Sequence, residues 1–569
     1  MNLTRSDYEF NNTKICQIMP KQIELNRVLI NLYMLLRYGG RRPVTRGRKE
    51  VTLDYIVSQL TEHSDMLIGF NDHPDLIKDW VYSDLIDVVF RGNVDKEAVV
   101  SPMPLHLNAY KLRNPKHAMD YRASEHLFSL LRAGDPQLIE RLKDFLGQGM
   151  TGGDIDSYDD ETTLDLDTLM IVRMVGTRNL KERVSGRGEE LDPPLCKGQA
   201  KLMCSDLRRL LTYENVVPRS ILIGYIQTTL GLHLGLYLLR LFHQFPGWTR
   251  DHQATSACLN CPVDPDTQNS PFSECPYAFQ SSEVSKSSEL SESGKIPKSQ
   301  RLQNFLPELL IDMGEDYKSH MAYLSQENCA THYAAMNDYI PAVFTTNQLF
   351  RYANSSTGQS QLAQQPQTIA EALQLLANSP SNFDIYFENL IDTILPPHKL
   401  AEEKAEVQAI YNMKELSPLE RFVQLVALER TKYYRKYLVH QIDSVLMKNK
   451  DAGLLRQGKG SRNRRRWYIG SRLLEVLVQI AVLEPVGQTP GANFRSRPIL
   501  IDQFVEWLKQ RYGIVLIPDK PNATIQDYEA FNNNFHFLKE RLREIGFYTD
   551  LSDAYNTQTI RPRYAIDPK

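Results

Sequence analysis

Three cysteines near the middle of the chain have the spacing of metal ligands. Cys258 and Cys261 form a Cys-x2-Cys turn, and Cys275 follows fourteen residues after the second of them. Two thiolates of such a turn bind one tetrahedral ion, and a third closes a zinc knuckle. We expect a small structural zinc site; an iron–sulfur cluster and unliganded thiols are the alternatives. The candidates for the fourth ligand, in order of preference, are Cys329, His332 and His252.

Basic side chains gather near the C-terminus. One group lies in the segment RQGKGSRNRRR and comprises Arg456, Lys459, Arg462, Arg464, Arg465 and Arg466. A second group follows and comprises Lys539, Arg541, Arg543, Arg561 and Arg563. From position 456 to the end, 18 Lys and Arg stand against 12 Asp and Glu, although the whole chain has a formal net charge of −3. Local positive charge on an acidic chain favours phosphate contacts, so we expect these residues to bind DNA.

The elements around these cations have the order of a winged-helix module. Apolar spacing and capping residues predict helices over 471–483, 499–512 and 524–545, and alternation predicts short strands over 547–551 and 559–566. In a helix-turn-helix the later helix enters the major groove, and the wing would follow the phosphate backbone. Winged helices also bind proteins, so a partner-binding scaffold is the alternative function.

A second basic segment, upstream of this module, interleaves cations with aromatic rings. It contains Arg430, Lys432, Tyr433, Tyr434, Arg435, Lys436 and Tyr437. Cations at this spacing can contact phosphates while the rings stack on bases. A solvated helix face with buried rings explains the pattern equally well, so both interpretations stay open.

The sequence contains none of the common catalytic motifs. It has no GxxxxGK[ST] P-loop, no GxSxG elbow and no HExxH helix. Asp312 followed by the Asp-Tyr-Lys triplet at 316–318 has the lettering of a metal-dependent nuclease, which would need adjoining strands to hold magnesium. Residues 306–324 have helical periodicity instead, which favours a surface helix with a salt bridge between Glu315 and Lys318. We therefore expect a non-enzymatic protein and keep the nuclease as a further alternative.

The length of the chain bounds its organisation. A chain of 569 residues exceeds one hydrophobic core, so we expect a mainly helical protein with several domains. The segments 281–300 and 355–367 are poor in apolar residues, and both are expected to be flexible. The expected domains are an N-terminal helical domain (1–150), a helical domain after an acidic linker (151–250), a cysteine-bearing region with helices (251–354), a further helical domain (368–455) and the winged helix (456–569).

Cysteine usage and one apolar segment bear on location. Seven cysteines, an odd number, and an N-terminus without an apolar signal core predict a reducing, cytoplasmic compartment. The segment 221–241 is long enough to span a membrane, but it contains His233 and Arg240. We expect a buried helix without membrane contact, in which Gly231 and Gly235 mark a close helix crossing.

Three C-terminal passages resemble known proteins. The sequences RRRWYIGSRLLEVLVQIAVL, FVEWLKQRYGI and LREIGFYTDLSDAYNTQTIRPRY are similar to the ends of large accessory proteins of bacterial anti-phage defence loci, with those of methylation-associated systems nearest. The resemblance covers about the last hundred residues and implies a bacterial protein that acts beside other defence subunits. It assigns no catalytic residue. Together with the basic residues, it favours a DNA-binding subunit of a defence or DNA-processing complex.

Overall fold

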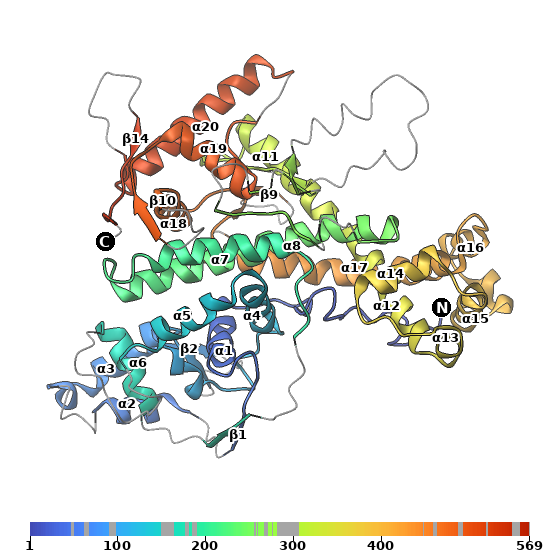
Figure 1. The fold of residues 1–569 in the computed structure, drawn as a ribbon, viewed down its shortest axis with the longest axis horizontal. Helices are drawn as coiled ribbons and strands as arrows, with labels where there is room; N and C mark the ends of the chain where they lie inside the picture. Colours follow the sequence, from blue (N-terminus) through green and yellow to red (C-terminus); the bar gives the residue numbers. More distant parts are fainter. Residues whose placement is uncertain are drawn as a thin grey trace.

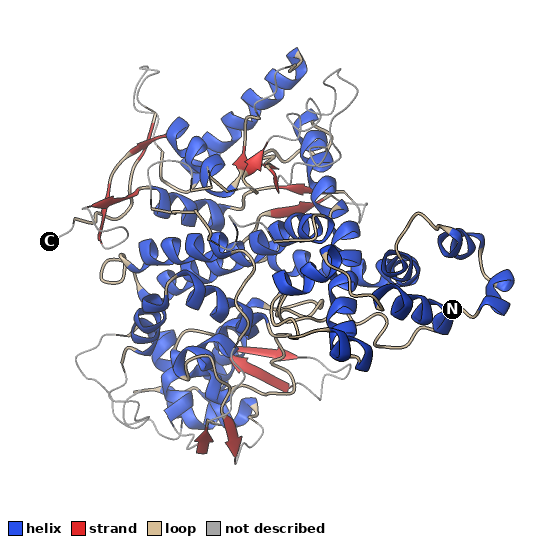
Figure 2. Cartoon of the chain, turned by 45° about the vertical axis from the view of Figure 1, so that its right-hand side comes forward, coloured by secondary structure: helices blue, strands red, loops and turns tan. Residues whose placement is uncertain are grey.

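The computed structural model of the chain consists mainly of α-helices, as the sequence predicts (Figure 1). Figure 2 shows that the strands are short and scattered among the helices, and each described sheet has two strands. The structure describes all residues except 47–50, 62–67, 90–97, 150–163, 177–180, 185–190, 255–257, 259, 267–270, 273, 276, 281–305, 448, 459–463, 487–492, 519–521, 549–557 and 568–569.

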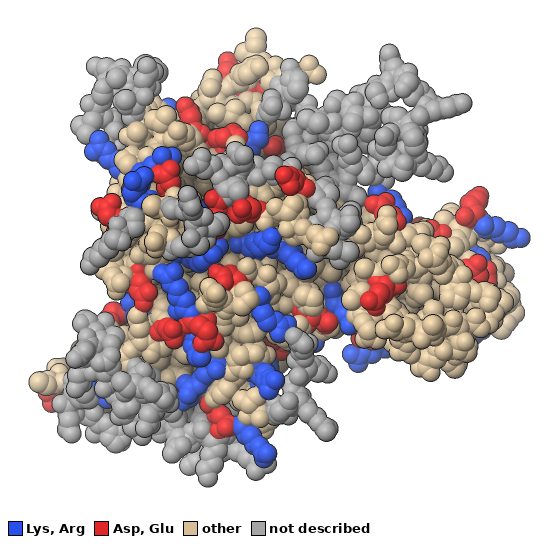
Figure 3. Space-filling view, in the orientation of Figure 1, with Lys and Arg blue, Asp and Glu red and all other residues tan. Residues whose placement is uncertain are grey.

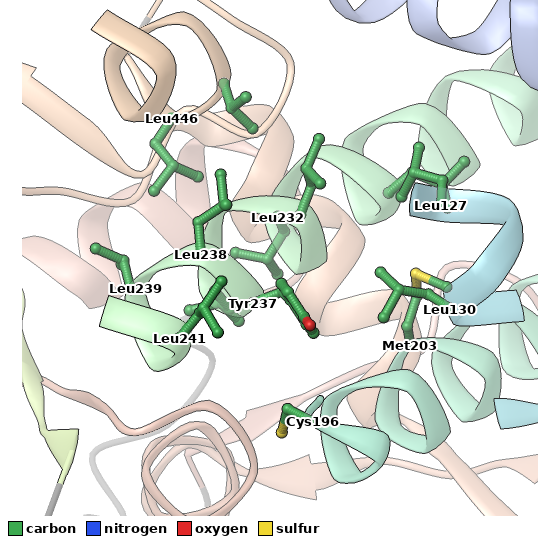
Figure 4. Close-up of a cluster of buried hydrophobic side chains, with 14 of the residues drawn as sticks. Leu127, Leu130, Cys196, Met203, Leu232, Tyr237, Leu238, Leu239, Leu241 and Leu446 are labelled. Atoms are coloured by element: carbon green, nitrogen blue, oxygen red, sulfur yellow. The ribbon is translucent and has the colours of Figure 1, made fainter. Parts of the chain in front are cut away.

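Two helices, α7 (Lys197–Leu211) and α8 (Arg219–Arg250), form the centre of the molecule. α8 is long and apolar enough to cross a membrane, but 94% of its most apolar window is buried inside the protein. Figure 4 shows Leu232 and Tyr237 of α8 among Leu127 and Met203 of neighbouring helices. The buried helix predicted from the sequence is confirmed, and it continues through Pro246.

Gly235 lets α8 pass close to the end of α17 (Pro418–Leu446). A Cβ atom at this position would overlap the side chain of Leu446. At Gly231 the nearest neighbour, Leu25 Cδ2, would stand 3.3 Å from an added Cβ. The helix crossing predicted at these two glycines is therefore tight at the second glycine and looser at the first.

The N-terminal elements pack on one side of the central pair. α1 and α4 contribute to the main hydrophobic core, and the far face of α1 enters a second, smaller core together with α6. β1 pairs with β4 and β2 pairs with β3, both antiparallel. These elements are α1 (Leu25–Arg37), β1 (Val44–Arg46), α2 (Leu53–Thr61), α3 (Pro74–Trp80), β2 (Ile86–Val89), β3 (Ala98–Pro102), α4 (Ala123–Gly134), α5 (Pro136–Gly147), α6 (Leu166–Gly176) and β4 (Lys181–Arg183).

The elements between α8 and the C-terminal segment differ from expectation in two places. The helix predicted over 306–324 begins only at His320, because the preceding residues pair as strands. The segment 355–367, expected to be a linker, contains a short helix that Ser355 caps. These elements are β5 (Phe279–Gln280), β6 (Leu306–Pro307), β7 (Leu309–Leu310), α11 (His320–Ala334), α12 (Met336–Asn354), α13 (Ser356–Gln361), α14 (Ile369–Ala377), α15 (Phe383–Ile394), α16 (Ala405–Asn412) and α17.

The C-terminal segment contains the three predicted helices. They are α18 (Ser471–Ala481), α19 (Ile501–Tyr512) and α20 (Ile525–Glu544). The predicted final strand is shorter than expected: β14 (Thr559–Ile560) pairs with β12 (Ile499–Leu500), and most of the strand predicted over 547–551 lies outside the described residues. The winged helix therefore stays a prediction. The remaining strands are β8 (Leu455–Gln457), β9 (Arg465–Trp467), β10 (Leu483–Val486), β11 (Asn493–Ser496) and β13 (Ile514–Val515).

The main core is continuous along the chain. Its buried side chains run from Phe10 to Ile566 and include members of each domain range expected from the sequence. Tyr213, just after α7, donates a hydrogen bond of 2.8 Å to the carbonyl of Gln479 in α18. The expected domain boundaries stay predictions, but the C-terminal segment packs directly on the central helices.

Candidate nucleic-acid interface and cysteine pocket

Four exposed arginines lie in or just after two short strands, β11 and β14, near the C-terminus. β10 and β11 form an antiparallel hairpin, and β12 pairs with β14. Two hydrogen bonds join β11 to the segment after β14: Ser496 N donates to Ile566 O at 3.0 Å, and Ile566 N donates to Ser496 Oγ at 2.8 Å. Phe494 in β11 and Ile560 in β14 are buried, whereas one arginine within β11 and three arginines that follow β11 and β14 are exposed. We call Arg495, Arg497, Arg561 and Arg563 the arginine ribbon.

Two carboxylates neutralise the arginine ribbon in part. Glu484 lies 3.5 Å from Arg495 and 3.2 Å from Arg497, and Glu475 pairs with Arg563. The side chains of Arg495 and Arg497 are 54% and 53% exposed, so solvent screens their ion pairs. Figure 3 shows Lys and Arg side chains at the edge of the molecule where β10 and β14 lie. The arginine ribbon therefore retains positive charge that is available for contacts with phosphate groups.

The end of α20 carries three further cations, which differ in the contacts that they already make within the protein. Arg541 forms ion pairs with Glu544 at 2.7 Å and with Glu315 at 2.8 Å. Lys539 and Arg543 each lie against an aromatic ring, and Arg543 is exposed to solvent. Arg541, one of the three α20 cations predicted to contact nucleic acid, is thus already paired with two carboxylates.

The basic hairpin of β8 and β9 is bound into the protein. Arg465 forms a bidentate pair with Asp443 of α17, with Nε–Oδ1 and Nη2–Oδ2 distances of 2.8 and 2.5 Å. Arg456 binds Glu315 and packs against the ring of Tyr317. The pair of Arg456 with Glu315 spans 141 residues of sequence, and that of Arg465 with Asp443 spans 22. The hairpin therefore joins three segments of the chain, which the sequence prediction did not anticipate.

Arg466 departs most from the predicted role of a DNA contact. Its side chain is fully buried, and its guanidinium binds Asp312 and donates to the carbonyls of Gly314 and Asp316 at 3.0 and 3.1 Å. Burial raises the pKa of Asp312, and the Arg466 cation opposes this rise. A guanidinium enclosed in this way cannot reach a phosphate, so Arg466 does not belong to the predicted DNA contacts.

The remaining members of the predicted basic cluster differ in exposure and in whether the structure describes them. Arg464 is exposed at the start of β9, whereas Lys459 and Arg462 lie outside the described residues. The nuclease motif does not converge on a metal site, because Asp312 is buried against Arg466 while Lys318 is exposed. The salt bridge expected between Glu315 and Lys318 is replaced by the pairs of Glu315 with two arginines.

A buried polar network holds α19 on the central helices. Asp206 of α7 accepts hydrogen bonds from Arg511 Nε at 2.9 Å and from the Tyr512 hydroxyl at 2.6 Å. His233 Nε2 lies 2.8 Å from the same carboxylate. Burial alone would raise the pKa of Asp206, but Arg511 and His233 hold it well below its usual range. Arg511 also donates to Pro265 O at 2.7 Å, which ties the cysteine-bearing loop to the same network.

The upstream basic segment lines a groove together with the N-terminal residues. Tyr434 is packed against Phe10 with ring centroids 4.4 Å apart, whereas Tyr433 is 48% exposed. Lys21 lies 4.2 Å from the ring centroid of Tyr437. One ring is thus structural and another faces solvent, so the two interpretations of this segment both stand.

Four cysteines line one pocket at the start of α7. Three of them are the predicted Cys258, Cys261 and Cys275, and the fourth is Cys196, the N-cap residue of α7. Burial raises the pKa of Cys196 to about 12; Arg240 acts against this, and the thiols of Cys275 and Cys261 add to it. Within the described part of the chain, no three potential ligands already have the spacing of a metal centre.

Cys329, the preferred fourth ligand, is not in this pocket. It is buried in α11, where its thiol interacts with Arg465 and Asp443. His332 is buried on the same helix, and His252 lies beyond the end of α8; neither lines the cysteine pocket. The prediction of Cys329 as a ligand is therefore wrong, because sequence proximity to the other cysteines does not bring α11 to the start of α7.

Sequence reasoning also missed three residues of these sites. Arg495 and Arg497 alternate with buried Phe494, a pattern that could have been recognised as a strand with basic residues on its outer face. Cys196 stands alone in its part of the sequence, and no spacing rule connects it with Cys258.

The fold and the sites define a mainly helical protein with a cationic C-terminal β surface, and comparison of its sequence places it among defence-system proteins. The chain belongs to the family described as methylation-associated defense system protein MAD7, whose model matches residues 5–564. The resemblance predicted from the C-terminal passages is confirmed and extends over nearly the whole chain. No curated protein and no solved structure matches it.

Proposed function

We propose that this protein is a non-enzymatic subunit of its defence system that docks on DNA through the arginine ribbon and the adjacent end of α20. Membership of a methylation-associated defence family supports a role beside other components of such a system. In this proposal the positive charge supplies most of the affinity, because each phosphate contact releases condensed counterions.

The arginine ribbon is the observation that carries the proposal. Two segments about 65 residues apart in sequence meet through a backbone hydrogen bond, and each carries two exposed arginines. Phosphate groups recur along both edges of a DNA groove, so several exposed cations next to paired strands suit backbone contact. In this proposal the arginines of the β8–β9 hairpin that pair with Glu315, Asp443 and Asp312 hold the protein together and do not touch DNA.

α20 is the element that we assign to the groove. It presents Asn532, Asn533 and His536 to solvent, and such side chains can bond to base edges. Arg561 N donates to Phe547 O at 3.2 Å, which sets the chain after α20 beside the arginine ribbon. This pairing supports a winged-helix arrangement of α19, α20 and the strands β12 and β14.

Charge-neutral variants test the proposal. The R495Q/R497Q/R561Q variant should bind a labelled duplex at least about tenfold more weakly than the wild type in fluorescence anisotropy at moderate salt. A matched control removes three exposed lysines from the α15–α17 region, K399Q/K404Q/K414Q, and should bind as the wild type does. Equal losses in both variants would mean that net charge and not the ribbon governs binding, which would overturn the proposal.

A scaffold role is the second candidate, and apolar exposure on α20 favours it. Ile525, Tyr528 and Phe537 are 80%, 59% and 40% exposed. Solvent-facing aromatic and aliphatic side chains on one helix suit a protein partner. If this role is the main one, substitution of these three residues abolishes co-purification with another system component, and the wild type shows no salt-sensitive DNA binding.

A further inference from the structure

We propose that Cys196, Cys258, Cys261 and Cys275 bind one zinc ion as four thiolates, and that the ion fastens the cysteine-bearing loop to the start of α7. The four side chains line a single pocket where the N-terminus of α7, the second half of α8 and this loop meet. The Cys-x2-Cys turn supplies two ligands. Cys196, which precedes this turn in the sequence, and Cys275, which follows it, supply one ligand each.

The close approach of the loop to α7 depends on Gly198. A Cβ atom at this position would stand 3.2 Å from Cys261 Sγ and 2.7 Å from Val263 Cγ2. The thiol of Cys261 therefore lies against the first turn of the helix that Cys196 caps. A larger residue at position 198 would crowd the side chains of Val263 and Cys261.

Polar side chains of α8 are placed as a supporting shell for thiolates. Gln244 Nε2 donates to Cys258 Sγ at 3.4 Å, which is the kind of N–H···S bond that orients metal-bound sulfur. Arg240 lines the pocket, donates to Tyr277 O at 2.7 Å and lies 4.1 Å from the ring centroid of Phe272. Four thiolates around a divalent ion carry a net charge of about −2, and a buried cation beside them offsets part of it.

The loop is already bonded to α7 on the other side of the pocket. Lys201 Nζ donates to the carbonyls of Cys261 and Val263, both at 3.1 Å. Asp266, further along the loop, pairs with Arg208 and Arg209 of α7. These bonds hold the cysteine-bearing loop against α7, and in the proposal the four thiols close around the ion and release their protons to solvent.

Zinc is the ion that this donor set favours. Four cysteine ligands at a closed, partly buried position are typical of structural zinc, which needs no open coordination position. The ion would stabilise the loop that also supplies Pro265 O to Arg511, so its removal should loosen α19 as well. This inference is independent of DNA binding, because none of the four cysteines lies on the arginine ribbon.

Metal analysis of the full chain, purified without chelators, tests the proposal. Inductively coupled plasma mass spectrometry should find one zinc per wild-type chain and less than about a tenth of that in Cys196→Ser. Cys329→Ser is the matched control, because it removes another buried cysteine outside the pocket, and it should keep its zinc. Full zinc content in Cys196→Ser, or loss in Cys329→Ser alone, would overturn the four-ligand assignment.

A second measurement covers the case in which Cys196→Ser does not fold. Stepwise titration of wild-type thiols with a mercurial should release zinc to a colorimetric chelator only as four thiols of one set react. Cobalt replacement should give intense sulfur-to-metal charge-transfer bands with tetrahedral d–d absorption. Iron with sulfide in place of zinc, or wild-type protein that neither contains zinc nor takes up cobalt, would refute the zinc site.

Discussion

Replacing Arg511 with methionine should loosen the C-terminal segment from the central helices. The Arg511 side chain is 3% exposed and its guanidinium bonds to Asp206, Ser205 and the carbonyl of Pro265. Methionine keeps much of the side-chain volume but leaves the Asp206 carboxylate buried without its cation. Removal of one partner of a buried ion pair costs about 3–5 kcal/mol.

Hydrogen exchange monitored by mass spectrometry measures this cost where it arises. A chain of 569 residues need not unfold in one step, so a local readout is preferable to a global free energy of unfolding. Amides in α19 should exchange about 140- to 3,700-fold faster in Arg511→Met, which is the stated cost converted at 1.4 kcal/mol per tenfold. Lys509→Met, a partly exposed cation on the same helix, should change the exchange rate by less than about threefold.

The double variant and the pH dependence sharpen this prediction. Asp206→Asn together with Arg511→Met should cost less than the sum of the single changes, because no uncompensated charge is left buried. The fold lowers the pKa of Asp206 below its value of about 3.9 in the unfolded chain. The ionised carboxylate therefore contributes fully to the free energy of unfolding above that pH, and its contribution is lost as pH falls below it. Equal exchange in Arg511→Met and Lys509→Met would refute the role of this ion pair.

Burial lowers the pKa of both His106 and His126 to about 3, so the fold keeps them neutral while the unfolded chain binds protons below about pH 6.5. The two neutral histidines contribute fully to the free energy of unfolding above about pH 6.5, and each contribution declines by roughly 1.4 kcal/mol per pH unit as pH falls. The thermal midpoint should therefore drop between pH 7 and 5. A midpoint that does not change with pH would contradict this prediction. Gly235→Ala should lower the urea midpoint by the equivalent of about 1–3 kcal/mol, because the added methyl overlaps a packed leucine; unchanged unfolding would show that the helix crossing is not tight. Arg466→Met should lower the thermal midpoint by several degrees and Arg464→Met should not, and equal midpoints would remove the distinction between buried and exposed arginines.

Local patterns in the sequence were sufficient to predict the helices of the C-terminal segment. Thr524 and Asp527 form the capping box of α20, and Gly513 takes the left-handed conformation that ends α19, so both boundaries could be predicted within about two residues. α8 was likewise predictable as a buried helix from its continuous apolar composition. These features depend on interactions within a few residues of each other.

Features that depend on distant partners could not be predicted in this way. Leu309 and Leu310 have helical spacing but form a strand, because β13 pairs with them across about 200 residues of sequence. The arginine run at 464–466 has the composition of a solvated loop, yet Asp443 and Asp312 bind two of its members. Both partners are ordinary acidic residues in sequence, and only the tertiary arrangement identifies them.

The salt dependence of DNA binding tests the central claim most directly. The association constant for one duplex is measured between 50 and 200 mM salt for the wild type and for R495Q/R497Q/R561Q. If these three arginines contact phosphates, the slope of log K against log salt should become shallower by about 2.7, at roughly 0.9 per contact. Equal slopes for the two proteins, or wild-type binding that does not change with salt, would contradict docking through the arginine ribbon.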